Sequence, residues 1–397
     1  MHLLRNRSLV QLSLGHMFVD MFASVVPVLL AFFSVPMELS NAQIAAAASI
    51  YSFASSLVQP LFGWLTDRVG SRWIGAFGLL WVMVFMSVVV IVGEGGSYQF
   101  LLVALVMAAL GSAAFHPQGA MNATHVEERH RTTSASIFFF FGNIGQMIGP
   151  LLTGFILEGP GTGTFPFLVL AGLPVVYLLA TTVPMAERAH HPIGERPSSP
   201  GRPSRVHLTV GVLVPLVALI ALRSWANFGT TTFLPKFYQE QGWDPASYGS
   251  IASLWLLGTA VGNVLGGQLA DRYGRRLIVT ISMLTMAPVM VILPMLHGAW
   301  PYPFIVWGGL TSGLSFSIIM VLAQSLLPGG KGLASGFTMG FMFASGAVGN
   351  VINGWLADRF SLAISLQTIA LVAFVAAICA LSLPRTRPSG GKASVPA

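Results

Sequence analysis

Long apolar runs dominate the chain, each about 20 residues long and bounded by short polar segments. A helix of that length crosses the roughly 30 Å hydrocarbon core of a bilayer, because each residue adds about 1.5 Å. Only 8% of the 397 residues are charged, against about 25% in soluble domains, and the mean hydropathy is +0.75. The runs are continuous rather than alternating, which favours helices over barrel strands. The sequence therefore predicts an all-α membrane protein.

Twelve transmembrane helices can be placed, six on each side of a polar segment. They cover residues 8–34, 43–65, 73–93, 98–123, 132–157 and 165–185, then 208–234, 246–269, 277–297, 302–327, 333–357 and 361–383. The segment 186–207 is rich in Pro, Ser, Arg and His and has no apolar period, which is typical of a solvated linker. We therefore expect two pseudo-symmetric six-helix bundles, 1–185 and 208–397, joined by this cytoplasmic linker. The second bundle should end in a short cytoplasmic tail.

One motif occurs in both halves of the chain. The sequence Leu-Phe-Gly-Trp-Leu-Thr-Asp-Arg-Val-Gly-Ser-Arg at 61–72 has a counterpart at 266–276, Gly-Gly-Gln-Leu-Ala-Asp-Arg-Tyr-Gly-Arg-Arg. Five positions match, each pair 204 residues apart: Gly63, Asp67, Arg68, Gly70 and Arg72 with Gly267, Asp271, Arg272, Gly274 and Arg276. Both copies lie between apolar runs, so each is a short loop joining two membrane helices. Such a repeat indicates a transporter of two related halves, with the substrate site between them.

The repeated loop suggests a part in gating. Asp67 and Asp271 would end their helices at the cytoplasmic face, where each could pair with a nearby arginine or cap a neighbouring helix. A charge cluster of this kind can hold one conformation and release it in another. The alternative is that the arginines only anchor the topology.

The net charge of +7 reflects topology rather than a nucleic-acid surface. Lys and Arg lie almost entirely in alternate loops and near both ends of the chain, and the opposite side has only Lys236 and Arg359. By the positive-inside rule, both termini are cytoplasmic. The single cysteine, Cys379, lies in the last apolar run, which leaves no disulfide and no thiolate metal site. We expect no metal, no cofactor and no nucleic-acid partner.

Glycines mark one helix of each half for close packing. The fifth predicted helix carries Gly145, Gly149, Pro150 and Gly154, and the eleventh carries Gly346, Gly349 and Gly354. Glycines about one turn apart give a flat helix face on which another helix packs tightly. Pro150 adds a possible kink, which would suit a helix that flexes during gating.

A few ionisable residues fall inside the membrane spans, where they are costly and therefore candidates for function. Asp20 is the only acid deep within a helix, and His16 lies one turn before it on the same face. His116 lies in the fourth helix and Arg223 in the seventh. We expect Arg223 to hold an anionic substrate, because its guanidinium fork matches phosphonate, phosphate or carboxylate oxygens. Asp20, with His16 or His116, would take up and release protons.

Simpler roles remain open for each of these residues. Asp20 could only neutralise Arg223, His16 could be a structural hydrogen-bond donor, and His116 could bond a carbonyl freed by Pro117. Uncharged polar residues could contact the substrate or link helices to one another. These candidates are Asn227, Gln118, Asn122, Asn143 and Gln146.

Several stretches resemble the major facilitator superfamily, and within it the fosmidomycin-resistance branch. The doubled Gly-x-Leu-x-Asp-Arg-x-Gly-x-Arg loop is similar to the superfamily signature. The branch resemblance is carried by Gly15-His-Met-Phe-Val-Asp20, Ser55-Ser-Leu-Val-Gln-Pro60, Gly111-Ser-Ala-Ala-Phe-His-Pro-Gln118, Phe141-Gly-Asn-Ile-Gly-Gln-Met-Ile-Gly-Pro150 and Gln324-Ser-Leu-Leu-Pro-Gly329. These stretches span both halves of the chain.

The resemblance implies a proton-driven exporter in the bacterial inner membrane that confers resistance to a phosphonate antibiotic. It also implies that His16, Asp20 and His116 occupy positions typical of the branch. The branch often has Phe-His-Pro-Glu where this chain has Phe-His-Pro-Gln at 115–118. Losing that acid removes one possible proton carrier and makes Asp20 the expected proton site.

Other functions fit the sequence less well. A proton-coupled uptake permease for a sugar or organic anion, or a broad multidrug exporter, would use the same fold. The chain has no Gly-Lys-Ser/Thr phosphate loop and no His-Glu-x-x-His motif, and one deep acid cannot form an aspartyl dyad, so an intramembrane enzyme or a sensor is disfavoured. We expect a monomeric transporter whose partners are a small molecule, protons and the lipid bilayer.

Overall fold

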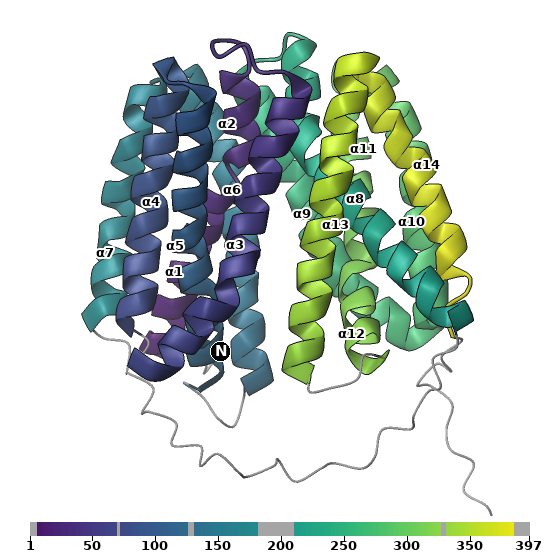
Figure 1. The fold of residues 1–397 in the computed structure, drawn as a ribbon, viewed down its shortest axis with the longest axis horizontal. Coiled ribbons are helices and arrows are strands. Elements are labelled where there is room, and N and C mark those ends of the chain that lie inside the picture. Colours follow the sequence, from purple (N-terminus) through teal and green to yellow (C-terminus); the bar gives the residue numbers. More distant parts are fainter. Residues whose placement is uncertain (1–5, 70–71, 126–130, 182–209, 327–330, 385–397) are drawn as a thin grey trace, which may run out of the picture. The chain divides into compact units, whose positions relative to one another are not determined.

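The computed structural model describes residues 6–69, 72–125, 131–181, 210–326 and 331–384. Within these ranges the regular structure is helical, and the helices run up and down in each half of the chain (Figure 1). The first half contains α1 (Arg7–Ala23), α2 (Val26–Phe33), α3 (Asn41–Val69), α4 (Arg72–Gly95), α5 (Tyr98–His125), α6 (Arg131–Glu158), the 3-10 turn η3 (Thr162–Phe167) and α7 (Leu168–Thr181). The second contains α8 (Val210–Glu240), α9 (Pro245–Tyr273), α10 (Arg275–Ile292), η4 (Leu293–Met295), α11 (Pro301–Leu314), α12 (Phe316–Leu326), α13 (Lys331–Arg359) and α14 (Leu362–Ala380).

Two of the predicted spans are broken helices. The first span divides into α1 and α2 at Ser24, whose hydroxyl donates to the Met21 carbonyl at 3.0 Å. The tenth divides into α11 and α12 at Ser315, whose hydroxyl donates to the Ser312 carbonyl at 3.1 Å. In both cases a serine hydroxyl bonds the backbone three residues earlier, which competes with the regular helical ladder. Hydropathy does not register such a break, because the apolar run continues through it.

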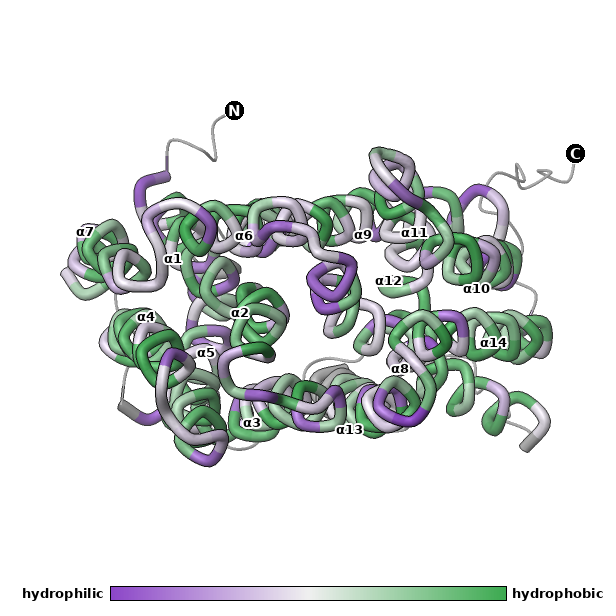
Figure 2. The backbone as a smooth tube through the Cα atoms, turned by 90° about the horizontal axis from the view of Figure 1, so that it is seen from above, coloured by the Kyte–Doolittle hydropathy of each residue, from purple (hydrophilic) through white to green (hydrophobic). Residues whose placement is uncertain are grey.

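The described helices are mostly apolar along their length (Figure 2), and eleven helical spans are long and apolar enough to cross a membrane. The predicted span at 333–357 is not among these eleven, although α13 has 29 residues. Its glycines and asparagines lower its hydropathy without shortening it. The prediction of an all-α membrane fold is confirmed.

The chain forms two compact units. The first includes 6–29, 35–38 and the described residues from Ile50 to Thr181, and the second includes 30–34, 39–49 and the described residues from Val210 onward. In the first unit α1 packs on α6 and α4 on α7, and in the second α8 packs on α13 and α10 on α14. These pairs correspond by their order in the two halves. The predicted boundaries at 185 and 208 and the linker between them lie outside the described residues and stay a prediction.

Glycines let helices approach at backbone distance. In the first unit, a Cβ added to Gly145 or Gly149 of α6 would strike the backbone of Met17 or Met21 in α1. In the second unit, a Cβ on Gly262 of α9 would lie 2.8 Å from the Leu310 carbonyl carbon in α11. Pro150 lies buried inside α6, and Gly154 of the same helix is also buried. The α1–α6 contact also sets the surroundings of Asp20, which lies in α1.

The end of α13 is bonded to the start of α3 through Asp358, an exposed residue. Its carboxylate accepts hydrogen bonds from the backbone N–H groups of Asn41 and Ala42, at 2.7 and 2.9 Å. These groups begin α3, in the segment 39–49 that belongs to the second unit. Free N–H groups and the helix dipole favour a carboxylate at this position. Asn350 of α13 extends the same contact by donating to the Ala45 carbonyl at 3.1 Å.

The second copy of the repeated motif shows why glycine is needed at its turn. Gly274 has φ of +95° and separates α9 from α10, and its N–H bonds the Ala270 carbonyl at 2.8 Å. A side chain is disfavoured at this φ. The turn lets the chain reverse after Asp271 and Arg272 and begin the next membrane helix at once.

The glycine contact between α9 and α11 gives a testable prediction. We expect Gly262→Ala to lower the free energy of unfolding by about 1–3 kcal/mol, because the added methyl group overpacks against the Leu310 backbone. Gly340→Ala in α13 is the matched control, since nothing lies within 4 Å of its Cβ position. That variant should be neutral or more stable by up to about 1 kcal/mol, from helix propensity. Thermal unfolding of both proteins in detergent measures the difference, and equal stability would rule out a tight α9–α11 contact.

Candidate functional site

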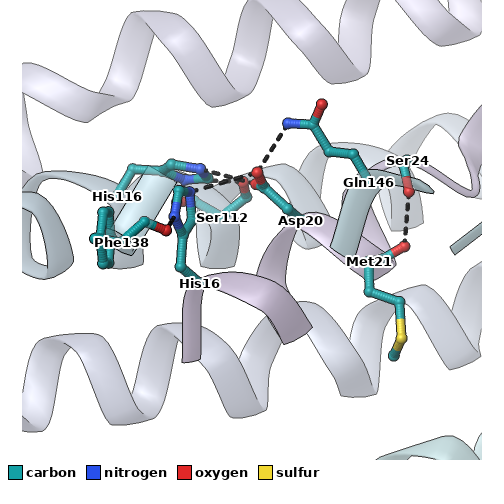
Figure 3. A network of polar contacts seen from close by, with 8 residues as sticks. All are labelled: His16, Asp20, Met21, Ser24, Ser112, His116, Phe138 and Gln146. Atoms are coloured by element: carbon teal, nitrogen blue, oxygen red, sulfur yellow. Dashed lines mark hydrogen bonds and ion pairs between the residues drawn. The ribbon is translucent and has the colours of Figure 1, made fainter. Parts of the chain in front are cut away.

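A buried carboxylate lies at the centre of the first unit. Asp20 occupies the last turn of α1, with 5% of its surface exposed, and His16, one turn earlier, is 3% exposed. His116 reaches the same carboxylate from α5 and Gln146 reaches it from α6 (Figure 3). The structure therefore brings together the three residues predicted to couple protons. In the described part of the chain, no lysine or arginine of this unit pairs with Asp20.

The four side chains meet at hydrogen-bond distances. His116 Nε2 lies 3.1 Å from Asp20 Oδ1, and His16 Nε2 lies 3.4 Å from Asp20 Oδ2. Gln146 Nε2 donates to Asp20 Oδ2 at 2.8 Å. Both imidazoles thus present the same ring nitrogen to a single carboxylate, one to each oxygen.

The remaining nitrogen of each histidine bonds a backbone carbonyl. His16 Nδ1 lies 2.8 Å from the Phe138 carbonyl oxygen of α6, and His116 Nδ1 lies 2.8 Å from the Ser112 carbonyl oxygen of α5. A carbonyl only accepts, so Nδ1 carries the hydrogen in both rings. Each Nε2 then either carries a second proton or turns a lone pair toward Asp20 (Figure 3). The centre is favourable only when a proton or another cation lies between these groups.

Packing fixes the His16 ring in this orientation. The ring stacks on Phe138 with a centroid distance of 4.1 Å and an interplanar angle of 12°. A Cβ on Gly142, one turn after Phe138, would lie 2.7 Å from His16 Nδ1 and 2.8 Å from Asp20 Oδ2. Only glycine leaves room for both groups at this point of α6. The centre therefore depends on the face that α6 presents to α1.

The second unit contains a buried cation of a different kind. Arg223 of α8 is 4% exposed, its Nη2 is 3.4 Å from the Ser312 carbonyl oxygen, and its guanidinium carbon lies 4.9 Å from the ring centre of Phe316. Its Nε has no hydrogen-bond partner, and among the described residues no carboxylate forms an ion pair with it. A buried guanidinium with a free donor is costly unless a ligand completes it.

Asn227 lies one turn beyond Arg223 and belongs to the same polar group. Its Oδ1 accepts from the Ser312 hydroxyl at 3.3 Å, so Ser312 connects both predicted substrate residues.

A second buried cation, Lys236, has a different environment. Its Nζ lies 3.2 Å from Glu240 and 2.7 Å from Gln239 on the same helix. Arg223 is therefore unlike Lys236, whose charge has partners within the protein.

The other predicted substrate ligands have varied positions. Gln146 bonds Asp20, which places it in the carboxylate centre. Gln118 is buried against Gly75 of α4, and Asn122 donates to the Gln118 backbone carbonyl at 3.1 Å. Asn143 is half-buried on α6. The Gln118 side chain thus packs between α5 and α4, and the Asn122 hydrogen bond stays within α5.

Only some residues of the repeated motif belong to the part of the chain that the structure describes. Arg68 stacks on Trp64 at 4.3 Å, and Arg272 lies 5.2 Å from the ring centre of Tyr273. A Cβ added to Gly63 or Gly267 would lie 3.7 Å or more from its nearest neighbour, so these glycines do not form the tight contact seen at Gly262. Gly70 and the side chains of Asp67 and Arg72 lie outside the described residues. The gating role of the motif therefore stays a prediction.

Some functional groups of the centre escape sequence reasoning. The carbonyls of Phe138 and Ser112 have no signature, because any residue offers a carbonyl. In the sequence, Phe138 appears only as part of a four-phenylalanine run, yet its ring is fully buried while Phe139 and Phe140 are more than half exposed. Gly142 could have been found from its place in α6, where it begins the glycine series that faces α1.

Comparisons with known proteins agree with this architecture. The family model described as Major Facilitator Superfamily matches residues 12–247 and 216–397. The fosmidomycin resistance protein of Escherichia coli (strain K12) is 29% identical over 357 residues, covering 88% of this chain and 86% of that protein. The uncharacterized MFS-type transporter YfnC of Bacillus subtilis (strain 168) is 31% identical over 387 residues, covering 95% and 92%.

Solved structures share the fold at low sequence identity. A bacterial homologue of the human lysosomal transporter Spinster, in an inward-facing and occupied conformation, matches with a TM-score of 0.76 at 14% identity, covering 94% of this chain and 95% of that one. A D-xylose-proton symporter matches with a TM-score of 0.75 at 16% identity, covering 96% and 99%. The chain is a multi-pass membrane transporter and not an enzyme, and it belongs to the major facilitator superfamily.

Proposed function

We propose that the chain is a secondary active transporter that exports a small anionic compound, such as a phosphonate of the fosmidomycin type, in exchange for protons. It would act as a monomer in the bacterial inner membrane, with both termini in the cytoplasm. The two halves would alternate access to a central substrate by rocking.

The environment of Arg223 carries the proposal for an anionic substrate. A guanidinium fork binds two oxygens of a phosphonate, phosphate or carboxylate at once. Here the fork is buried, and among the described residues its Nε has no partner and its one hydrogen bond is a long contact of 3.4 Å to a carbonyl. An anion would accept hydrogen bonds from the free N–H groups of Arg223 and would neutralise its charge. Asn227, linked to Arg223 through Ser312, would add a neutral polar contact.

The centre around Asp20 supports coupling to protons. Two imidazole nitrogens face one carboxylate, and backbone carbonyls fix the other nitrogen of each ring. The centre therefore changes from attractive to repulsive as its shared protons leave. Such a dependence can bias helices α1, α5 and α6 between two arrangements. Asp20 would carry the coupling proton, with His16 and His116 as its partners.

The choice of a phosphonate among anions and the direction of transport rest on similarity. The relative that is 29% identical over most of both chains is named for fosmidomycin resistance, and export is the simplest route by which a transporter confers resistance. The likeness to the D-xylose-proton symporter, at 16% identity, concerns the fold and does not favour a sugar. The repeated motif would act as a cytoplasmic latch, with Asp67 and Asp271 as its charges.

A growth assay tests the function directly. The chain is expressed in a drug-sensitive bacterium that lacks its own exporters, and fosmidomycin is titrated alongside unrelated hydrophobic cations. Protection against fosmidomycin alone supports the proposal. Protection against the cations instead would replace it with a broad multidrug exporter. No protection despite good membrane expression would overturn fosmidomycin export and leave uptake of an organic anion as the next candidate.

We expect Asp20→Asn to abolish accumulation of substrate against a gradient. The amide keeps the shape of the side chain but cannot exchange a proton with the histidines. Proton-driven uptake of substrate into inside-out vesicles with an acidic interior, which measures export, should fall at least tenfold. Exchange of labelled for unlabelled substrate needs no proton and should persist. Glu158→Gln, at the exposed end of α6, is the control and should transport normally. Accumulation by Asp20→Asn at the wild-type level would eliminate Asp20 as the coupling group.

We expect Arg223→Met to weaken binding of a phosphonate substrate by about 10–100-fold, because a charged hydrogen bond contributes about 1.5–3 kcal/mol. Binding of a neutral amphipathic compound should change little. Lys236→Met removes another buried cation, one that already has partners, and should leave phosphonate affinity unchanged. Scintillation proximity binding with purified protein gives all three values. An equal loss for charged and neutral ligands would make Arg223 structural.

A further inference from the structure

We propose that His16, Asp20 and His116 form a binding site for a divalent transition-metal ion, with Zn²⁺ as the ion best matched to it. The three residues each offer one ligand atom, and these atoms all lie within 4.8 Å of one another. This inference stands on the positions of the ligand atoms and does not depend on what the protein transports.

The spacing of the ligand atoms fits a tetrahedral ion. Zinc binds imidazole nitrogen and carboxylate oxygen at about 2.0–2.2 Å, so two ligands of one tetrahedral ion lie roughly 3.4 Å apart. His116 Nε2 lies 3.1 Å from Asp20 Oδ1 and His16 Nε2 lies 3.4 Å from Asp20 Oδ2, so each imidazole is at about this distance from one carboxylate oxygen, and one atom from each residue lies within 4.8 Å of the other two. A small approach of the two histidines to each other completes the geometry, with the fourth position left to water or a ligand.

The surrounding bonds are those that metal-binding histidines use. Such a histidine almost always donates its second ring N–H to a carbonyl or a carboxylate, which fixes the tautomer and directs the lone pair at the metal. His16 and His116 both do this, through the Phe138 and Ser112 carbonyls, each at 2.8 Å. Gln146 orients the carboxylate from its other side at 2.8 Å (Figure 3). Two neutral imidazole lone pairs and a carboxylate aimed at one point repel each other unless a cation lies between them.

The site also has an entrance and a preference among ions. The His116 side chain is 26% exposed, whereas those of His16 and Asp20 are 3% and 7% exposed. An ion would therefore enter past His116. Two imidazoles with one carboxylate suit zinc and its transition-metal neighbours, while Mg²⁺ and Ca²⁺ prefer sites made of oxygen ligands. A bound ion would tie α1 to α5 and should stop any rearrangement between these helices.

The experiment uses the full chain, purified in detergent without a polyhistidine tag and stripped of metal. Isothermal titration with ZnCl₂ gives affinity and stoichiometry at fixed pH, and Co²⁺ gives an absorption spectrum that reports nitrogen and oxygen ligands in tetrahedral geometry. We expect one ion per chain. His16→Gln and His116→Gln should each weaken Zn²⁺ binding at least tenfold and remove the tetrahedral Co²⁺ bands. Zn²⁺ should raise the unfolding temperature of the wild type but not of these two variants.

Two control variants separate this site from adventitious binding. His297→Gln removes an exposed histidine between α10 and α11. His190→Gln with His191→Gln removes the neighbouring pair at 190–191, which could bind metal by itself. Both controls should bind Zn²⁺ like the wild type.

Loss of binding in the 190–191 variant, or unchanged binding in His16→Gln and His116→Gln, would overturn the proposal. Absence of stoichiometric binding to the wild type would overturn it as well. Because binding is measured without transport, failure here leaves the proposed export untouched, and failure of export leaves this result standing.

Discussion

A carboxylate in the hydrocarbon core is costly, and the first unit is arranged to meet that cost at Asp20. The charge is almost fully buried there, so its polar partners must come from the protein. Gln146 on α6 donates to the carboxylate, and His16 on α1 and His116 on α5 donate to it when their Nε2 atoms are protonated. Helices α1, α5 and α6 therefore all contact the Asp20 carboxylate through these side chains. The glycines of α6 that face α1 are what allow this approach, because a larger residue at Gly142 would occupy the space of the carboxylate itself.

The same arrangement makes the centre around Asp20 sensitive to its number of bound protons. A carboxylate paired with an arginine would be neutral over a wide pH range and would act as a fixed link. Asp20 is instead surrounded by imidazoles, which gain and lose protons near neutral pH. Their Nδ1 atoms are held by backbone carbonyls, so a change of proton number cannot be absorbed by turning the rings over. The change must be met by movement of the helices or by another cation.

The membrane helices and the buried charges could be predicted from the sequence, because hydropathy and charge determine both. The apolar runs located the membrane helices, and the rarity of acids within them singled out Asp20, with His16 one turn away. Breaks at Ser24 and Ser315 were invisible, because a serine hydroxyl that bonds its own backbone leaves the hydropathy unchanged. The cap that the exposed Asp358 carboxylate provides for α3 was also invisible in the sequence. In each case the deciding partner is a backbone group, which no residue type reveals.

Arg223 and Asp20 show how buried charges differ in meaning. Each is almost fully buried, and either could have been a structural ion. Asp20 already has polar partners in Gln146, His16 and His116, so what can vary at this centre is the proton or other cation that the carboxylate and the imidazoles share. Arg223 has a free Nε and a long contact to a carbonyl, and nothing among the described residues supplies the negative charge it needs. A buried cation in that state is destabilising until an anion arrives, so the free protein stays poised for the ligand that removes the deficit. An unpaired buried charge is thus better evidence for a substrate site than a paired one.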